Sequence, residues 1–291
     1  MQLPKKAIIA VAGTGTRFLP ATKVVPKEML PIIDKPIVQY SVEEVVASGV
    51  ENVILVTREG SNIIEEHFKN SLDLEKQLTK AGKNDYLKIV QAIPKLAKFN
   101  FVKQTKEMPY GNATPLLASM DLLDNEPFFY LFGDDMTLAD VPVCQQLAEV
   151  YKKNPEVGAV IAVQKMPREV LYRYGVVKFK KGTQNEYESI VEKPALGEEP
   201  SAVVSFGRYL FSPKILSIIK KLKTGKDNEL WLVDAINELA KTEKILVHEI
   251  AGQWLTTGDA LNYLKTTVEF VKKRNDLKDE FKKYVVESLK K

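Results

Sequence analysis

A glycine-rich segment near the start of the chain carries the first residues whose types and spacing suggest chemistry. It reads Gly13-Thr14-Gly15-Thr16-Arg17 and directly follows a short apolar run. Glycines let the backbone approach a phosphate chain and present its N–H groups to an anion. The segment has neither the GxGxxG spacing of a dinucleotide-binding fold nor the terminal Lys-Ser/Thr of a P-loop. For this segment alone, a phosphate-binding loop and a plain strand-to-helix turn both stay open.

Cations and prolines follow this glycine segment. Arg17, Lys23 and Lys27 are interspersed with three prolines, at positions 20, 26 and 31. Prolines at this density exclude a regular helix or a central strand, which predicts a stiff, extended loop. Phe18, Leu19, Met29 and Leu30 in the same stretch distinguish it from an ordinary solvated loop. Three cations on a rigid loop suit the charge of a triphosphate.

Polar residues also follow apolar runs later in the chain. Asp134 and Asp135 come just after the run 128–132, at the edge where α/β sheets bind ligands. Magnesium is typically held by one or two carboxylates together with substrate phosphates, although a turn or a helix cap is the alternative for such a pair. Gln104 ends another apolar run, and its amide offers both a donor and an acceptor, although a surface glutamine is the commoner situation.

The order of apolar runs predicts the elements that position these residues. A mixed, mostly parallel sheet covered by helices, of Rossmann-like α/β class, is expected from alternating strand-like and helical segments. After position 163 the runs shorten and predict a small antiparallel part, and the period of three to four residues beyond position 259 predicts C-terminal helices. The expected strands cover 7–12, 53–57, 99–103, 128–132, 157–163, 175–180 and 186–193, with a helix over 36–48 that stops at Gly49.

Composition narrows the class of protein. The net charge of +4 is spread along the chain, which argues against a nucleic-acid partner. The single cysteine, Cys144, cannot form an internal disulfide and is interpreted as structural. No apolar run approaches the ~20 residues of a membrane span, so a cytoplasmic protein without membrane contact is expected. The polar stretch 62–98 is longer than a crossover needs and is interpreted as a lid or a docking arm.

The chain resembles the sugar-1-phosphate nucleotidyltransferase family along essentially its whole length. The resemblance rests on G-x-G-T-R from Gly13, P-K-E-M-L-P at 26–31 and D-K-P at 34–36. The stretch 22–31 is most similar to the bacterial-type uridylyltransferases of this family, which use UTP and glucose 1-phosphate. Membership implies one nucleotidyltransferase domain over 1–291, with a nucleotide-binding half at 1–135, a sugar-binding half at 136–258 and a helical segment at 259–291.

The resemblance also implies residue roles. Catalysis would fall to Arg17, Lys27, Asp134 and Lys193. Nucleotide binding would fall to Ala12, Gly13, Gly15, Thr16, Glu28, Gln104 and Gly111, and sugar binding to Gly175, Glu192 and Lys193. Asp134 would hold Mg²⁺. Segments 207–209 and 229–234 also match family landmarks and are expected to be mainly architectural.

Two positions depart from the family pattern. Asn112 stands where a histidine is usual, and Thr256 stands where a second metal-ligating aspartate is expected. The ion would then depend on Asp134, phosphates and water, or on Asp135; Asp259 is another candidate, but its register is wrong.

The implied reaction is in-line attack of glucose 1-phosphate on the α-phosphorus of UTP, which gives UDP-glucose and pyrophosphate. Lysines, arginine and Mg²⁺ would stabilise the developing charge, and an anionic phosphate nucleophile needs no general base. A homodimer or homotetramer is implied. A thymidylyl or broader nucleotidyltransferase and a non-catalytic sensor of UDP-sugar stay open as alternatives.

Overall fold

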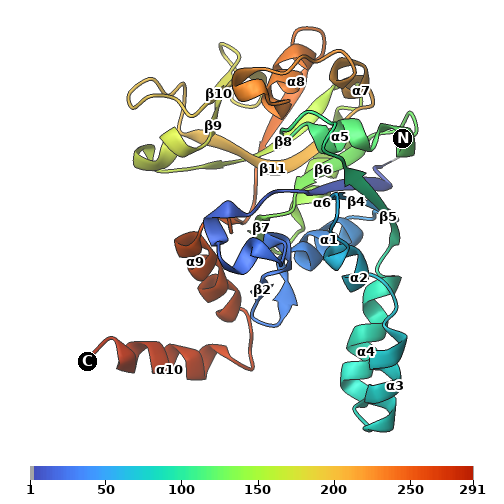
Figure 1. Ribbon diagram of the computed structural model, residues 1–291. Helices are drawn as coiled ribbons and strands as arrows, with labels where there is room; N and C mark the ends of the chain where they lie inside the picture. The colour runs from blue at the N-terminus through green and yellow to red at the C-terminus, as the bar shows by residue number, and fades with distance from the viewer. Residues whose placement is uncertain (1–2, 291) are drawn as a thin grey trace.

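A mixed nine-stranded sheet forms the centre of the computed structural model, which describes residues 3–290 (Figure 1). Its main path is β10-β9-β11-β6-β1-β4-β5, with β8 paired to β11 and β12. The strands are β1 (Lys6–Val11), β4 (Asn52–Arg58), β5 (Lys98–Gln104), β6 (Phe128–Phe132), β8 (Ala159–Lys165), β9 (Gly175–Phe179), β10 (Tyr187–Glu192), β11 (Val203–Phe211) and β12 (Ile245–Glu249).

The first half of the sheet is parallel. β1 pairs in parallel with β4 on one side and β6 on the other, and β4 pairs in parallel with β5. Ala7, Ile8 and Ile9 of β1 are fully buried, because helices cover both faces of a parallel sheet and each strand is then apolar on both sides. The carboxyl ends of β1, β5 and β6 therefore meet at one edge. The predicted α/β class is confirmed.

The second half of the sheet contains the predicted antiparallel strands. β11 runs antiparallel to both β6 and β8, and β9 and β10 form a hairpin in which Gly175 pairs with Glu192. The turn of this hairpin covers the predicted positions 181–185.

Helices pack on both faces of the sheet. One face carries α1 (Ile37–Ala47) and α6 (Val143–Lys153), whose buried side chains share a core with β1, β4 and β8. The other carries α5 (Thr114–Ala118), α7 (Lys214–Ile219) and α8 (Leu232–Leu239), which share a second core with β6 and β11. The first helix stops at the predicted glycine, since Gly49 has φ 91°.

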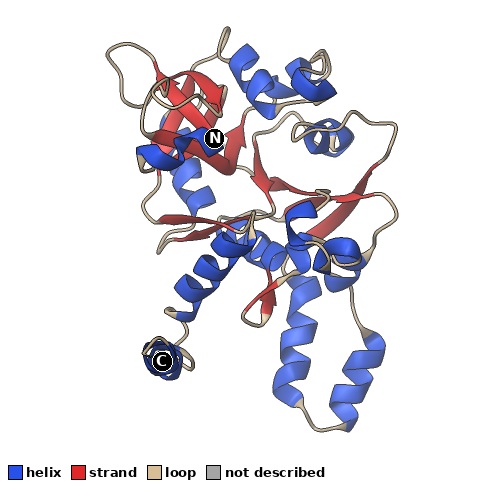
Figure 2. Ribbon diagram, turned by 60° about the vertical axis from the view of Figure 1, so that its left-hand side comes forward, coloured by secondary structure: helices blue, strands red, loops and turns tan. Residues whose placement is uncertain are grey.

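Residues 62–98 form helices that leave the body of the molecule. After α2 (Ile63–His67), the helices α3 (Leu72–Lys80) and α4 (Asn84–Ala92) make an antiparallel hairpin that projects from the sheet (Figure 2).

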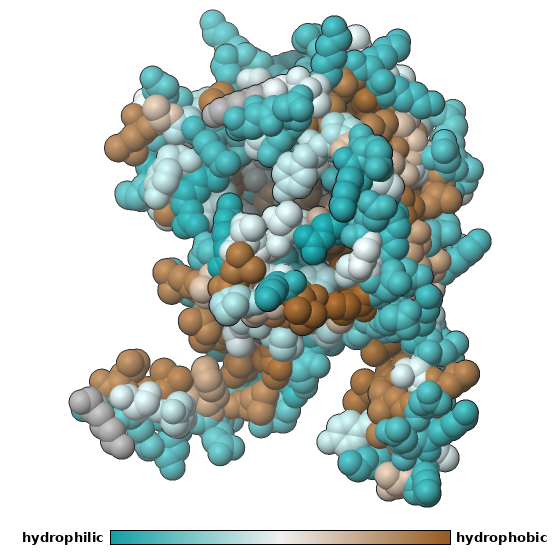
Figure 3. Space-filling model, viewed as in Figure 1, coloured by the Kyte–Doolittle hydropathy of each residue, from teal (hydrophilic) through white to brown (hydrophobic). Residues whose placement is uncertain are grey.

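The C-terminal residues form the predicted helices, α9 (Ala260–Val271) and α10 (Lys278–Ser288), and α10 points away from the core. Figure 3 shows apolar surface over these two helices. None of the helices in residues 3–290 is long and apolar enough to cross a membrane.

The loop that follows β1 differs from the predicted extended conformation. It folds into three single turns of 3₁₀ helix, namely η1 (Thr16–Phe18), η2 (Ala21–Lys23) and η3 (Lys27–Met29). Pro20 and Pro26 directly precede the last two turns, where the missing N–H of proline costs no hydrogen bond. The prediction of an extended loop was wrong, because prolines exclude a long helix but start short turns well.

Two small sheets complete the structure. β2 (Pro31–Ile32) pairs with β3 (Lys35–Pro36), directly after the loop. β7 (Asp135–Leu138) pairs with β13 (Gln253–Thr256), so the segment after β6 lies against the segment that precedes α9.

Candidate functional site

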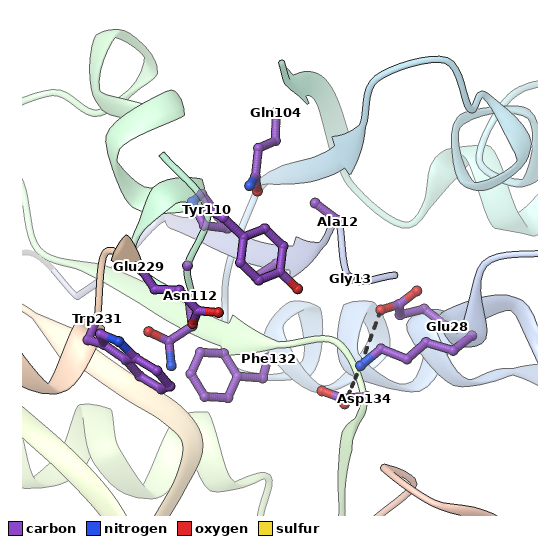
Figure 4. Close-up of a pocket in the computed structure, with 14 residues that line it drawn as sticks. Ala12, Gly13, Glu28, Gln104, Tyr110, Asn112, Phe132, Asp134, Glu229 and Trp231 are labelled. Carbon is purple, nitrogen blue, oxygen red and sulfur yellow. Dashed lines mark hydrogen bonds and ion pairs between the residues drawn. The ribbon is translucent and has the colours of Figure 1, made fainter. Parts of the chain in front are cut away.

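A pocket of about 230 Å³ opens at the carboxyl edge of the parallel strands (Figure 4). It is reached by the ends of β1, β5 and β6, as the position of the polar residues in the sequence predicts. Its walls are formed by Ala10, Ala12, Gly13, Lys27, Glu28, Gln104, Tyr110, Gly111, Asn112, Pro115, Phe132, Asp134, Glu229 and Trp231. No residue of 62–98 is among them, so the projecting hairpin is not a lid over this pocket in the structure.

An ion pair lies in the wall of the pocket. The Nζ atom of Lys27 is 2.5 Å from Oδ2 of Asp134 and 3.9 Å from Oε1 of Glu28. Burial is the largest single influence on the pKa of Lys27 and would lower it, but the negative charges of Asp134 and Glu28 and the hydrogen bond to Asp134 together outweigh burial, and the pKa rises to about 12. Burial is likewise the largest influence on the pKa of Asp134 and would raise it, but the charge of Lys27, the hydrogen bonds and the charge of Arg17 together lower it. At neutral pH the pocket therefore contains a fixed cation beside a fixed anion.

Glu28 is the buried carboxyl group of the site. Its side chain is 2% exposed, and its Oε2 atom has no hydrogen-bond partner. Burial raises the pKa of Glu28 to about 7, against the weaker opposing effect of Lys27. A carboxyl group in this state holds a proton near neutral pH and can donate a hydrogen bond to a ligand in the pocket.

Asp135 is held by the protein scaffold. Trp254 Nε1 donates to its Oδ1 atom and the Gly207 amide donates to its Oδ2 atom, both at 2.8 Å. Both oxygens already accept hydrogen bonds from buried groups, and the role of Asp135 as a second metal ligand stays a prediction. Its carboxylate ties β7 to β11 and β13.

Arg208 supports the turn that carries Asp134. It is 1% exposed and pairs with Glu44, with Nη2 at 2.9 Å from Oε2. The same guanidinium donates to the carbonyl oxygens of Asp135 at 2.8 Å and Phe132 at 3.2 Å. Buried charge-assisted hydrogen bonds on both sides of the turn fix its backbone. The expectation that 207–209 is mainly architectural agrees with this geometry.

The segment around Thr256 lies against Asp134 through its backbone. Thr257 donates from its amide and from its hydroxyl to the carbonyl oxygen of Asp134, at 3.1 and 2.6 Å. The hydroxyl of Thr256 accepts from the Gly258 amide at 3.2 Å. Asp259 caps α9 by accepting from the Asn262 amide, and it pairs with Arg173 at 2.8 Å. The hydroxyl of Thr256 therefore makes a local contact, whereas Asp259 both caps α9 and joins its start to Arg173, 86 positions away.

Arg17 lies at the rim and outside the pocket wall. Its side chain is exposed and donates to the carbonyl oxygen of Gly258 at 3.2 Å. Gly15 and Thr16 are on the same turn and are likewise absent from the pocket lining. Gly15 has φ 64°, a conformation that favours glycine and allows the chain to turn after β1.

The donor set of the pocket is compatible with magnesium bound together with an anionic ligand. No group of three or more His, Cys, Asp or Glu side chains within residues 3–290 could hold a metal ion by itself. Magnesium needs only one or two carboxylates when phosphates and water supply the remaining ligands. Asp134 offers one carboxylate in the pocket wall, and Glu28 adds a buried oxygen without a partner.

The predicted sugar residues lie together on the β9–β10 hairpin, beside the pocket. A Cβ atom added at Gly175 would be 2.9 Å from Glu192 Oε2, so any larger residue would have to displace this carboxylate. Lys193 has φ 49° and donates from its amide to Tyr174. Its Nζ atom is 6.0 Å from the ring centroid of Trp231, which lines the pocket. The hairpin therefore meets the pocket at Trp231.

Several side chains of the wall were not predicted from the sequence. Tyr110, Phe132, Glu229 and Trp231 all line the pocket, although 229–234 was expected to be mainly architectural. That expectation was incomplete. Leu230 is buried, whereas the flanking Glu229 and Trp231 face the pocket. The alternation of polar or aromatic residues with leucines in this segment was the available signal, since an extended chain turns alternate side chains to opposite sides.

A second cavity adjoins the pocket beside Gln104. It has a volume of about 530 Å³ and shares Ala12, Gln104 and Tyr110 with the pocket. Its lining also includes the charged residues Arg58, Glu59 and Lys106. The groove at the strand edge therefore extends beyond Gln104 along side chains of both charges.

Comparison with known proteins relates the whole chain to one family. The family model described as "Nucleotidyl transferase" matches residues 6–273. A UTP--glucose-1-phosphate uridylyltransferase of Staphylococcus haemolyticus is 40% identical, over 99% of this chain and 99% of that protein. The enzyme of the same name from Bacillus subtilis is 37% identical, over 96% of this chain and 95% of its own length.

Solved structures give the same relationship. A UDP-glucose pyrophosphorylase from Acinetobacter baumannii superposes with a TM-score of 0.89 at 30% identity, covering 98% of this chain and 99% of that chain. A UDP-glucose pyrophosphorylase solved in complex with UDP-glucose superposes with a TM-score of 0.82 at 33% identity, covering 94% of this chain and all of that chain.

Proposed function

This chain belongs to the nucleotidyl transferase family, and we propose that it transfers a uridylyl group from UTP to glucose 1-phosphate, releasing pyrophosphate and forming UDP-glucose. The observation that carries the proposal is the placement of the Lys27–Asp134 ion pair beside Ala12, Gly13 and Gln104 in a single pocket. The reaction requires a cation to bind phosphate, a carboxylate to bind a metal and an amide to bind the edge of the base. Lys27, Asp134 and Gln104 provide these three groups.

The nucleotide binds with its base between the start of the glycine loop and the end of β5. The backbone of Ala12 and Gly13 and the amide of Gln104 offer donors and acceptors suited to the uracil edge. Gly111 and Glu28 line the same pocket, and Glu28 in its protonated form can donate a hydrogen bond to an oxygen of the nucleotide. Gly15 and Thr16 present backbone N–H groups to the phosphates from the turn that follows β1.

The cations stabilise the transition state by their fixed positions. Lys27 neutralises charge that develops on the α-phosphate and leaving group, because Asp134 holds its ammonium in the pocket wall. Arg17, at the rim, binds the departing pyrophosphate. Lys193 holds the phosphate of the sugar, and Glu192 accepts hydrogen bonds from sugar hydroxyls next to Gly175.

Asp134 is the residue that holds Mg²⁺, which when bound supplies positive charge to the phosphates of the nucleotide. The residues around Asp134 orient its carboxylate. Arg208, Asp135 and Trp254 hold the turn on which Asp134 lies, so that its carboxylate stays in the wall without a change of rotamer. The sugar phosphate is already anionic near neutral pH, and the chain therefore needs no general base for the attack.

Residues 1–135 and 136–258 act as nucleotide and sugar halves of one domain. Two copies, or four, assemble through apolar side chains that the isolated chain leaves exposed. Such side chains are present on the C-terminal helices, where Leu261, Leu264 and Tyr284 are each more than 60% exposed. The projecting α3–α4 hairpin supplies further exposed apolar groups, Leu72, Tyr86 and Ile89.

Measurement of pyrophosphate release tests the proposed function. The purified chain is incubated with Mg²⁺, glucose 1-phosphate and UTP, and in parallel with dTTP, ATP or GTP. Release with UTP above all other nucleotides supports the proposal. Equal release with dTTP would indicate a broader nucleotidyltransferase. Binding of UDP-glucose without release from any nucleotide and sugar phosphate would instead indicate a sensor.

A further inference from the structure

The indole of Trp231 forms an aromatic wall at the point where the β9–β10 hairpin meets the pocket. It lines the pocket with Asn112 and Phe132, and the Nζ atom of Lys193 is 6.0 Å from its ring centroid. We propose that Trp231 is the platform on which the pyranose ring of the sugar substrate packs, which makes it a specificity-determining residue for the sugar. This inference rests on the proposed function and extends it to a residue outside the predicted site.

The backbone on both sides of Trp231 is held rigidly. The amide of Leu230 donates to Tyr110 at 2.7 Å, and its carbonyl accepts from Ala113 at 3.0 Å. The amide of Leu232 donates to Oδ1 of Asn112 at 2.7 Å. Leu230 and Leu232 are thus both hydrogen-bonded to the loop 110–113. The backbone of Trp231 between them is therefore fixed before any ligand binds. A preorganised aromatic group loses little conformational freedom when it binds a ligand.

The close approach of these two segments depends on Gly111. A Cβ atom at this position would be 2.3 Å from the carbonyl oxygen of Leu230, and Gly111 has φ 141°. Only glycine therefore lets the segment 229–232 lie directly on the loop. The consequence is that backbone contacts on both sides place Trp231 in the wall of the pocket.

The neighbours of Trp231 indicate a sugar more than a base. Lys193 follows Glu192 at the end of β10, and these are the two side chains proposed to hold the sugar phosphate and sugar hydroxyls. In Figure 4, Trp231 lies with Asn112 and Phe132, while Ala12 and Gly13 lie on the other side of Tyr110. Tyr110 therefore lies between Trp231 and the backbone of Ala12 and Gly13 in this view.

The chemistry of an indole suits one face of a pyranose. The axial C–H bonds of a glucose ring make that face apolar, whereas its hydroxyls point outward around the ring. A flat, partly buried aromatic ring removes this apolar face from water, and polar groups around the rim bind the hydroxyls. Glu229 lines the pocket with Trp231, and Glu192 precedes Lys193, whose Nζ atom lies over the indole ring.

Steady-state kinetics test the proposed role of Trp231, because loss of a sugar contact should change the KM for glucose 1-phosphate and not the KM for UTP. Trp231→Ala is expected to raise the KM for glucose 1-phosphate about tenfold, because the variant loses one aromatic contact with the sugar. The KM for UTP is expected to change less than about twofold. Trp231→Phe keeps an aromatic face and is expected to recover most of the wild-type KM. Leu122→Ala, which removes an exposed apolar side chain outside the pocket, is the control.

Two kinetic outcomes would overturn the proposal. A rise in the KM for UTP with an unchanged KM for glucose 1-phosphate would place Trp231 at the nucleotide. Equal loss of turnover in Trp231→Ala and Trp231→Phe with both KM values unchanged would make it a structural residue.

Intrinsic fluorescence gives a readout independent of turnover. The chain has two tryptophans, and the second, Trp254, is buried beside Asp135. Titration with UDP-glucose is expected to change the emission of the wild type substantially more than titration with UDP, and the difference is expected to disappear in Trp231→Phe. The same response to UDP and UDP-glucose would contradict a sugar contact. Because binding is measured directly, this experiment decides the role of Trp231 even if the chain releases no pyrophosphate.

Discussion

Lys27 and Asp134, 107 positions apart in the sequence, meet in the pocket wall with Nζ and Oδ2 2.5 Å apart. The pair joins the loop after β1 to the turn after β6, and each partner holds the other in its charged form. The ammonium is thereby set in place before a substrate arrives, which is the condition under which a fixed charge lowers a reaction barrier.

Replacement of this ammonium is expected to remove most of the turnover. Lys27→Met should lower kcat by ~10²-fold or more, the typical effect of losing one preorganised group that stabilises transition-state charge. The fold should persist, because methionine occupies a similar volume. Lys35→Met, which removes a lysine paired with Glu43 outside the pocket, is the matched control. Near-normal turnover in Lys27→Met would exclude this role.

Glu28 is expected to make stability depend on pH. Its pKa in the folded chain, about 7, exceeds the ordinary value of 4.5, so between these values the folded state keeps a proton that the unfolded chain releases. Stability contributed by this proton is therefore lost as pH rises through the window, and the loss is complete above about pH 7. Glu28→Gln removes the titration.

From pH 5 to pH 8, the unfolding free energy of Glu28→Gln should accordingly rise by ~2 kcal/mol relative to wild type. Denaturant unfolding at both pH values measures this difference. Glu51→Gln, at an exposed carboxylate, is the control and should follow wild type. A constant difference between wild type and Glu28→Gln at the two pH values would show that Glu28 does not titrate in this range.

Gly111 is expected to tolerate no side chain. Gly111→Ala should destabilise the fold by ~2 kcal/mol or more, because the added Cβ clashes with the backbone of Leu230 and the positive φ is strained. Gly182→Ala is the matched control, since Gly182 also has positive φ but has no atom within 4 Å of an added Cβ. This control should lose only ~1 kcal/mol, from backbone strain. Thermal unfolding of both variants measures the difference, and equal losses would exclude the clash.

Arg208 and Glu44 are expected to be strongly coupled. Arg208→Met should cost ~3–5 kcal/mol of stability, because it leaves the carboxylate of Glu44 buried without its partner. The double variant Arg208→Met/Glu44→Leu should recover a large part of that loss, since it removes both charges. Denaturant unfolding of the single and double variants measures the coupling. If the losses of the two single variants simply add, the pair is not coupled.

The fold was largely predictable because its strands are strongly apolar runs. Parallel strands such as β1 and β4 are buried on both faces and read as continuous apolar segments, and helix α1 ends at a glycine that the sequence marks clearly. The edge location of Asp134 followed from the same reasoning. The three short turns after β1 were not predicted, because proline density excludes a long helix without specifying what replaces it.

The composition of the pocket wall was less predictable. Whether Asp134 or Asp135 faces the pocket depends on Trp254 and Gly207, which are distant in the sequence and occupy the oxygens of Asp135. Trp231 reaches the pocket only because Gly111 permits a close contact with Leu230. Such tertiary contacts leave no periodic signal, so the sequence indicated the chemistry of the site better than its complete lining.

The fate of the α-phosphorus of UTP tests the central claim most directly. UTP labelled at the α-phosphorus is incubated with glucose 1-phosphate and Mg²⁺, and the nucleotide products and pyrophosphate are separated and quantified. The account predicts that the label appears in UDP-glucose in equal amount to the unlabelled pyrophosphate released, and that Lys27→Met slows the formation of both by ~10²-fold or more. Label recovered as UMP, or left in UTP while UDP-glucose binds normally, would contradict it.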